Sequence, residues 1–234
     1  MRYKSTRGEV SGLRFTDALL MGLARDGGLL VPEHIPDVQD QLAAWKNYSF
    51  VDLARKMLPL YVDDIDEEIL DGIIVSSYEE FDHSDVVSLK PLNDIHVLEL
   101  FHGPTLAFKD IALQLLSRLF AHVLELKKKK INILGATSGD TGSAAIAGIR
   151  GKPNMDIFIM YPDQRISPLQ ELQMTTVSDQ NVHCMAMQGS FDDCQNLMKN
   201  VFGDLEFKSE FGLSAVNSVN WARILPQIVY YGYA

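Results

Sequence analysis

The sequence predicts an α/β protein, in which a mostly helical N-terminal unit precedes a largely parallel sheet with flanking helices. Two observations lead to this prediction. Three amphipathic segments dominate residues 1–85, whereas from Val86 onward short β-rich runs alternate with helical segments. Such alternation is typical of parallel sheets covered by helices. We therefore expect a helical unit over residues 1–85, an α/β domain over 86–220, and the start of another helix over 221–234.

Composition bounds the class of protein. With 234 residues, 47% of them hydrophobic, the chain can bury one large core or two small ones. The first residues, MRYKSTRGEV, lack the apolar core of a signal peptide, and no apolar run approaches the roughly 18 residues of a membrane span. Cys184 and Cys194 lie in different expected elements, which favours free thiols over a disulfide or a zinc site. We expect a soluble cytoplasmic protein.

Charge is spread unevenly along the chain. The net charge is −10, and residues 1–94 hold 9 Lys and Arg against 18 Asp and Glu, whereas residues 95–234 hold 12 against 13. An acidic chain without a broad basic face argues against nucleic acid as a partner. The basic run Lys127–Lys130 is expected at the end of a helix, where cations complement the helix dipole.

The helices of the first part are predicted from apolar spacing and end signals. The first is expected over Phe15–Arg25. A second, over Ser49–Leu58, begins with the Ser-x-x-Asp spacing of a capping box, and Pro59 ends it. A third is expected over Glu67–Ser76, followed by a polar loop.

The second part is predicted to supply the sheet. In open parallel sheets, ligands usually bind at loops that follow the carboxyl ends of strands. The β-rich runs are Val86–Leu89, Ile95–Leu100, Ile131–Leu134, Asp156–Met160 and Val182–Met187.

One lysine stands where an irregular Gly-Pro segment gives way to a strongly periodic helix. Lys109 lies between Phe108 and Asp110. The positive end of the helix dipole disfavours an ammonium ion, so this amine is suited to lose its proton and to form a Schiff base with an aldehyde. The ordinary alternative is a surface lysine whose alkyl chain covers apolar groups. His102, seven residues earlier, is a candidate orienting group.

A second segment looks suited to bind an anion. The strand expected at Ile131–Leu134 leads into GATSGDTGS and then into the small-residue helix Ala144–Ile149. Glycines permit close backbone approach, and N–H groups together with the hydroxyls of Thr137, Ser138 and Thr141 can hold a carboxylate or phosphate. The segment is neither a Walker loop nor GxGxxG. A polar turn that needs glycine for its geometry is the alternative.

Several segments in one order resemble threonine synthases, a family of fold-type II pyridoxal phosphate enzymes. HGPTLAFKD from His102 and GATSGDTGSAA from Gly135 are the most specific of these. The resemblance extends over almost the whole chain. The further segments are FTDALLMGLARDGGLLVPEHIP from Phe15, YPDQRISPLQELQM from Tyr161, GSFDDCQNLMK from Gly189 and LSAVNSVNWARILPQIVYY from Leu213.

The resemblance implies a cofactor and a reaction. Lys109, beside Phe108, would carry pyridoxal phosphate as a Schiff base and move protons. The substrate would be O-phospho-L-homoserine, converted with water to L-threonine and phosphate. The matching loop in the superfamily implies that substrate or cofactor contacts come from Thr137, Ser138, Gly139, Asp140 and Thr141.

A further set of polar residues is assigned to the substrate. Arginine offers a bidentate fork for phosphate, and amides and hydroxyls suit an anion. The alternative for Asn217 and Asn220 is to cap the helix expected near Trp221. The set is Asn217, Ser218, Asn220 and Arg223.

The resemblance also implies that something is missing. Threonine synthases continue for about as long again, with the glycine-rich loop that holds the cofactor phosphate and the partner of the pyridine nitrogen. We therefore expect an N-terminal portion that binds the cofactor weakly and is inactive alone. The alternatives are a pyridoxal phosphate lyase acting on another phosphorylated amino acid, and a non-catalytic metabolite-binding relative, which would be expected to lack Lys109.

Overall fold

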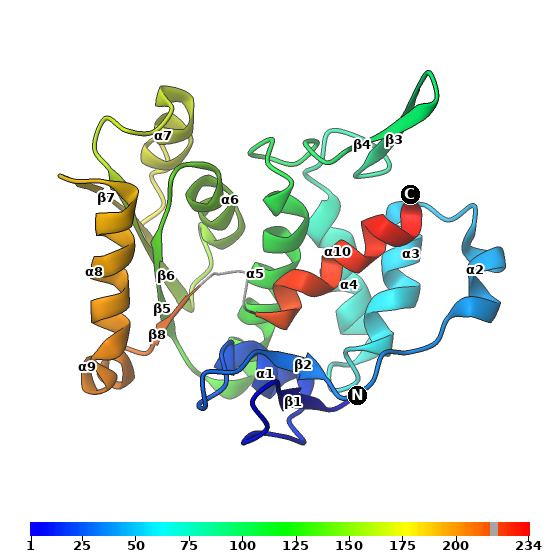
Figure 1. Cartoon of the computed structure of the whole chain (residues 1–234), viewed down its shortest axis with the longest axis horizontal. Helices are drawn as coiled ribbons and strands as arrows, with labels where there is room; N and C mark the ends of the chain where they lie inside the picture. Colours follow the sequence, from blue (N-terminus) through cyan, green and yellow to red (C-terminus); the bar gives the residue numbers. More distant parts are fainter. Residues whose placement is uncertain (216–219) are drawn as a thin grey trace. The chain divides into compact units, whose positions relative to one another are not determined.

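The computed structural model describes residues 1–215 and 220–234. They form two compact units, Met1–Leu116 with Ser218–Ala234, and Ser117–Asn217, which are described separately below. The α/β class expected from the sequence is confirmed, because helices flank a parallel sheet (Figure 1). The division expected near residues 85 and 220 rests on sequence pattern and stays a prediction. Within the described residues, no helix combines the length and apolar character that crossing a membrane requires.

The first unit is mainly helical. Its helix α3 (Phe50–Met57) buries apolar residues that are spaced about one helical turn apart, and it packs against α10 (Trp221–Tyr233). Two short strands, β1 (Tyr3–Ser5) and β2 (Leu30–Pro32), pair antiparallel. The remaining elements before the sheet are α1 (Phe15–Met21), α2 (Gln39–Trp45), the 3-10 helix η1 (Leu58–Leu60) and α4 (Glu67–Tyr78).

The ends of these helices follow local signals. The predicted cap of α3 is confirmed, since the Ser49 hydroxyl accepts the N–H of Asp52 at 3.2 Å. The predicted end of α1 is wrong, because the helix stops at Met21 rather than Arg25. Gly22 adopts a φ of 66° and donates its N–H to Ala18, which closes the helix. Sequence patterning also missed α2, none of whose residues is buried.

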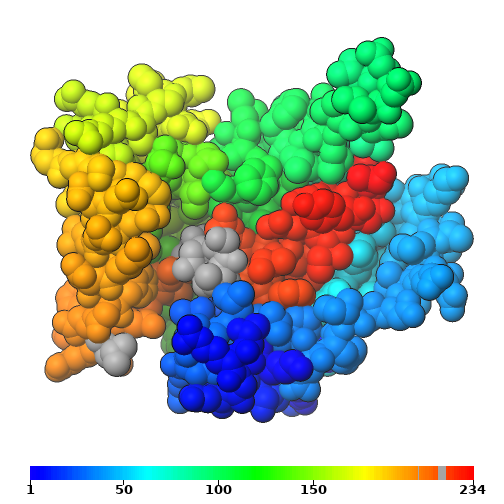
Figure 2. Space-filling view, in the orientation of Figure 1, coloured from blue at the N-terminus to red at the C-terminus, as the bar shows by residue number. Residues whose placement is uncertain are grey.

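A hairpin stands apart from the other elements of this unit (Figure 2). Strands β3 (Ser88–Leu92) and β4 (Ile95–Glu99) pair antiparallel, with Pro91 opposite His96. These runs were expected within the α/β alternation, but among the residues that the structure describes they pair only with each other. The two-residue turn at Asn93 and Asp94, where Asn93 has a φ of 53°, joins them directly and leaves no room for a crossover helix.

The second unit contains the parallel sheet, in the strand order β7-β6-β5-β8. All three neighbouring pairs are parallel, so the predicted parallel sheet is confirmed. The strands are β5 (Ile131–Ala136), β6 (Met155–Pro162), β7 (Val182–Met187) and β8 (Leu213–Ser214), of which β8 was not predicted.

Helices cover both faces of this sheet. In Figure 1, α6 (Asp140–Ile149) and α8 (Phe191–Gly203) lie on opposite sides of the strands. On the α8 face, Leu134 and Met160 form a buried cluster with Cys194. The unit also contains α7 (Pro168–Thr175), α9 (Leu205–Glu210) and the later part of α5 (Lys109–Lys127). The loop that follows the carboxyl end of β5 is the glycine-rich segment identified in the sequence.

Candidate functional site

Lys109 is the first residue of α5, so its predicted place in the first helical turn is confirmed. The side chain is half-buried, and its Nζ lies 5.6 Å from the centroid of the Phe108 ring. That ring is 45% exposed. A cation and an aromatic face at this distance attract each other, so the ring helps to orient the amine.

Asp110 anchors the loop that leads to the lysine. Its side chain is fully buried, and its two carboxylate oxygens accept the N–H and the hydroxyl of Thr105 at 2.8 and 2.7 Å. Burial raises the pKa of Asp110, although the hydrogen bonds from Thr105 act in the opposite direction. The sequence placed this carboxylate beside the lysine, but did not predict that it holds the loop from inside.

The same anchor explains the glycine of the HGP sequence. A Cβ atom on Gly103 would lie 2.4 Å from Cβ and 2.6 Å from Oδ2 of Asp110. Gly103 also accepts the N–H of Leu106 at 3.0 Å. The backbone therefore passes too close to the buried carboxylate for any side chain.

His102 connects this loop to the preceding segments. Its Nδ1 lies 3.0 Å from a carboxylate oxygen of Asp82, and its Nε2 lies 3.3 Å from one of Glu99. Its carbonyl accepts the N–H of Asp82 at 2.9 Å. These contacts fix the start of the loop, in line with the orienting role considered from the sequence.

Thr137 organises the glycine-rich loop of the second unit. Its side chain is 1% exposed, and its Oγ1 accepts the N–H groups of Gly139 and Gly142 at 3.0 and 2.9 Å. Two of the N–H groups that the sequence offered to an anion are therefore used within the protein.

Helix α6 begins at Asp140, four residues earlier than predicted, so Asp140 and Thr141 belong to its first turn. Both side chains are half-buried, whereas Ser138 is exposed. Gly139 has a φ of 139°, and a Cβ there would lie 2.1 Å from the Gln170 side chain. The loop thus presents three polar side chains at its surface on a backbone that only glycine permits.

Two of the remaining predicted site residues, Asn220 and Arg223, lie at the start of α10. Asn220 is 2% exposed, accepts the N–H of Ala222 at 3.0 Å and donates to the carbonyl of Leu19 at 2.9 Å. This is the capping role that the sequence left as an alternative. Arg223, in the first turn, is 7% exposed. Asn217 and Ser218 lie outside the described residues.

Within each unit, the predicted site residues therefore lie in groups of close neighbours along the chain. Lys109 adjoins Phe108, and Asn220 and Arg223 share the start of α10, all in the first unit. The second unit contains the loop 137–141. Sequence reasoning missed the two buried groups that shape these loops, the Thr105–Asp110 contact and the Thr137 oxygen.

Comparison with known proteins gives one consistent result. Residues 2–78 match the family described as "Threonine synthase N terminus". The threonine synthase of Schizosaccharomyces pombe is 49% identical, over 99% of this chain and 48% of that protein. The threonine synthase of Pseudomonas aeruginosa is 51% identical, over 100% of this chain and 50% of its own length.

Solved structures agree. The crystal structure of a pyridoxal phosphate-bound threonine synthase from Brucella melitensis superposes with a TM-score of 0.94, at 48% identity, over 99% of this chain and 51% of that one. The chain spans about half the length of the relatives that it matches.

Proposed function

Because the chain belongs to the threonine synthase family and corresponds to its N-terminal portion, we propose that it carries the cofactor lysine of a threonine synthase. The reaction is the conversion of O-phospho-L-homoserine and water to L-threonine and phosphate, by a pyridoxal phosphate-dependent carbon–oxygen lyase. The observation that carries the proposal is Lys109, at the first residue of α5, on a loop held by the buried Asp110. A lyase for another phosphorylated amino acid, or a non-catalytic relative, is not favoured by relatives named threonine synthase.

The residues around Lys109 fit pyridoxal phosphate. The cofactor is held through its aldehyde by a lysine amine, and it supplies an electron sink that makes the Cα–H of a bound amino acid removable. Lys109 offers a half-buried amine, and Phe108 offers an accessible ring beside it. We therefore assign cofactor binding to Lys109 and Phe108.

Lys109 also has the catalytic role in this proposal. Its amine takes the proton from Cα of the substrate and returns it at the end of the reaction. A base must reach the proton from a fixed position, and the Thr105–Asp110 contact fixes the loop immediately before the lysine. The lysine is therefore carried by a rigid support rather than by a free surface loop.

The loop of residues 137–141 is proposed to hold the amino-acid end of the substrate. The hydroxyls of Ser138 and Thr141 can donate to its carboxylate. Asp140 is suited to accept a hydrogen bond from a donor group of the substrate, because its own carboxylate would repel the substrate's anionic groups. Thr137 and Gly139 contribute by shaping the turn, through the contacts of the Thr137 oxygen and the backbone angle of Gly139.

The phosphate end of the substrate is assigned to the start of α10 and the segment before it. Arg223 provides the guanidinium, whose planar donors match phosphate oxygens. Asn220 contributes by holding the first turn of α10, since both polar atoms of its amide bond to the protein. Asn217 and Ser218 remain proposals from the sequence alone.

The cofactor assignment is tested by covalent trapping. The chain is incubated with excess pyridoxal phosphate, reduced with borohydride and digested, and the labelled peptide is identified by mass spectrometry. We expect the label on Lys109, none in Lys109→Ala, and an unchanged label in Lys128→Ala, which removes an exposed lysine near the other end of α5. Equal labelling of many lysines would refute the assignment.

Activity of the chain by itself is a separate question. We propose that the 234 residues alone release no phosphate from O-phospho-L-homoserine, because the relatives that they match are about twice as long. Phosphate release is measured with wild type and Lys109→Ala in parallel. Release by the wild type that disappears in Lys109→Ala would contradict the proposed inactivity while supporting the role of the lysine.

A further inference from the structure

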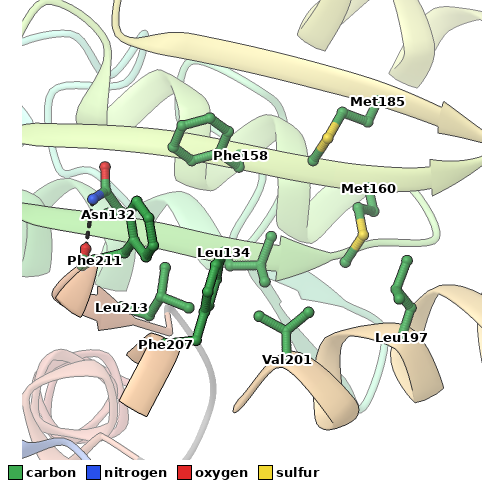
Figure 3. A pocket seen from close by; sticks show the side chains of 10 residues that line it. All are labelled: Asn132, Leu134, Phe158, Met160, Met185, Leu197, Val201, Phe207, Phe211 and Leu213. Atoms are coloured by element: carbon green, nitrogen blue, oxygen red, sulfur yellow. Dashed lines mark hydrogen bonds between the residues drawn. The ribbon is translucent and has the colours of Figure 1, made fainter. Parts of the chain in front are cut away.

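A cavity of about 360 Å³ lies within the second unit, between the parallel sheet and helices α8 and α9 (Figure 3). Four strands form its floor and the two helices form its walls. Nine of its ten lining residues are apolar, which sets it apart from the polar loops described above. The lining consists of Asn132, Leu134, Phe158, Met160, Met185, Leu197, Val201, Phe207, Phe211 and Leu213.

The register of the sheet builds the floor. Leu134 lies opposite Phe158, and Met160 lies opposite Met185, in parallel pairs. At the other edge, Asn132 lies opposite Leu213. Since side chains alternate between faces with a period of two, these residues all point to the α8 side. The sheet thus presents a continuous apolar row.

The helices cover this row incompletely. Under α8, the cluster of Leu134, Met160 and Cys194 is buried, with exposed fractions of 9%, 3% and 1%. At the rim, Phe207 and Phe211 of the α9 region remain 41% and 45% exposed. The cavity is therefore closed at its base and open at its rim, so a molecule can enter.

The polar content of the lining excludes charged ligands. Its one polar side chain, Asn132, donates through Nδ2 to the carbonyl of Phe211 at 2.6 Å (Figure 3). A carboxylate, phosphate or ammonium group would lose its hydration here without a charged partner among the lining residues. The substrate and cofactor of the proposed function are all charged, so this cavity is a different site from the loops that follow the strands.

We propose that this cavity binds one small, uncharged, apolar molecule of about the size of two fused aromatic rings. An apolar cavity of about 150 Å³ in another protein holds benzene, so the larger volume suits a molecule of about twice that size. Phe158, Phe207 and Phe211 offer aromatic contacts. Met160 and Met185 have flexible thioether side chains that adapt to the shape of a ligand.

The two methionines also report on binding. The chain is prepared with methionine labelled with ¹³C at the methyl group and titrated with naphthalene, which is neutral and has two fused rings. We expect saturable shifts of the methyl signals of Met160 and Met185. The methyl signals of Met155 and Met174, which are buried in the same unit but do not line the cavity, are expected to stay in place.

Matched variants distinguish binding in the cavity from binding to other apolar surface. Leu197→Trp fills part of the cavity and is expected to weaken naphthalene binding by about tenfold or more. Leu169→Trp makes the same change on α7 at a side chain that is 63% exposed and outside the lining, so binding should be unchanged. Naphthalene-2-sulfonate, of similar shape but charged, should not shift the two methionines.

Three results would overturn the proposal. These are shifts that do not saturate or that spread over all methionines, equal binding by the two tryptophan variants, and equal binding of the sulfonate. Sedimentation of wild type and Phe211→Ser without ligand adds an independent check, because a dimer formed by wild type but not by the variant would show that a second copy of the chain covers the cavity instead.

Discussion

The lysine loop, residues 102–110, and the glycine-rich loop, residues 135–143, solve the same structural problem with different chemistry. Each leads into a helix, and in each a buried polar side chain accepts hydrogen bonds from the turn. In the lysine loop the acceptor is the carboxylate of Asp110, which lies inside the helix that follows. In the glycine-rich loop it is the hydroxyl of Thr137, which lies before the turn.

The difference concerns charge. A hydroxyl is neutral at every accessible pH, whereas a buried carboxylate has lost its hydration, which raises the pKa of Asp110. The lysine loop should therefore respond to pH and to the loss of a charged acceptor. The glycine-rich loop should respond only to the loss of hydrogen bonds.

Removing the carboxylate is expected to have the largest effect. Asp110→Ala removes the buried carboxylate that accepts the N–H and the hydroxyl of Thr105, and should lower the free energy of unfolding by about 3 kcal/mol. Denaturant titration measures this change. Asp192→Ala removes an exposed aspartate from the first turn of α8 and should cost less than about 1 kcal/mol. Equal losses in the two variants would show that burial of Asp110 is unimportant.

Removing the hydroxyl should have an intermediate effect. Thr137→Val keeps the shape of the side chain but leaves the N–H groups of Gly139 and Gly142 without their acceptor, at a cost of about 2 kcal/mol. Thr176→Val provides the control, because that exposed hydroxyl donates to a helix carbonyl and leaves no buried group behind. If Thr137→Val and Thr176→Val were equally stable, the turn would not depend on Thr137.

The smallest effect expected is the dependence on pH. The ordinary aspartate pKa is 3.8, and in the folded protein the pKa of Asp110 is raised. As pH rises above 3.8, the unfolded chain releases this proton first, so the folded state binds more protons and becomes less stable. The free energy of unfolding of wild type, relative to Asp110→Asn, should fall as pH rises, by at most about 1.4 kcal/mol per pH unit, which is the limit for one proton.

The glycine-rich loop provides the comparison for this pH experiment. Thr137→Ser keeps a hydroxyl, so its stability relative to Asp110→Asn should follow the wild-type curve. If wild type and Asp110→Asn kept a constant difference over the acid range, the carboxylate would titrate as it does in the unfolded chain. In that case, the two loops would not differ in how their contribution to stability depends on pH.

The sequence predicts those parts of the fold whose residue pattern is compatible with only one structure. Lys109 begins α5 because apolar periodicity starts there, and the parallel sheet follows from strands that alternate with helices. The β3–β4 hairpin was missed, although Asn93 and Asp94 form a two-residue turn between two strand-like runs. That turn signal covers two residues, whereas the alternation of strands and helices extends over the whole second part of the sequence.

The candidate site was harder to predict, because its supporting contacts depend on burial or are ambiguous in the sequence. The Asp110–Thr105 contact depends on the burial of a carboxylate that the sequence shows only as a neighbour of the lysine. A hydroxyl near glycines can bind an anion as well as it can accept hydrogen bonds from the turn, so the sequence did not distinguish these two roles for Thr137. The spacing of Thr137, Gly139 and Gly142 was the available signal, since one oxygen can accept from both later N–H groups.

The two outer edges of the β3–β4 hairpin also differ in the backbone groups that they offer for hydrogen bonding. Leu92 and Ile95 flank the turn as a hydrogen-bonded pair, so the next pair, Pro91 and His96, directs its backbone groups outward. Proline has no N–H to offer on the β3 side, whereas β4 keeps the N–H of His96, beside the 59% exposed Ile95. Of the two edges of this hairpin, β4 is therefore the one more open to pairing with a strand of another chain, and a proline or lysine placed in β4 would oppose such pairing.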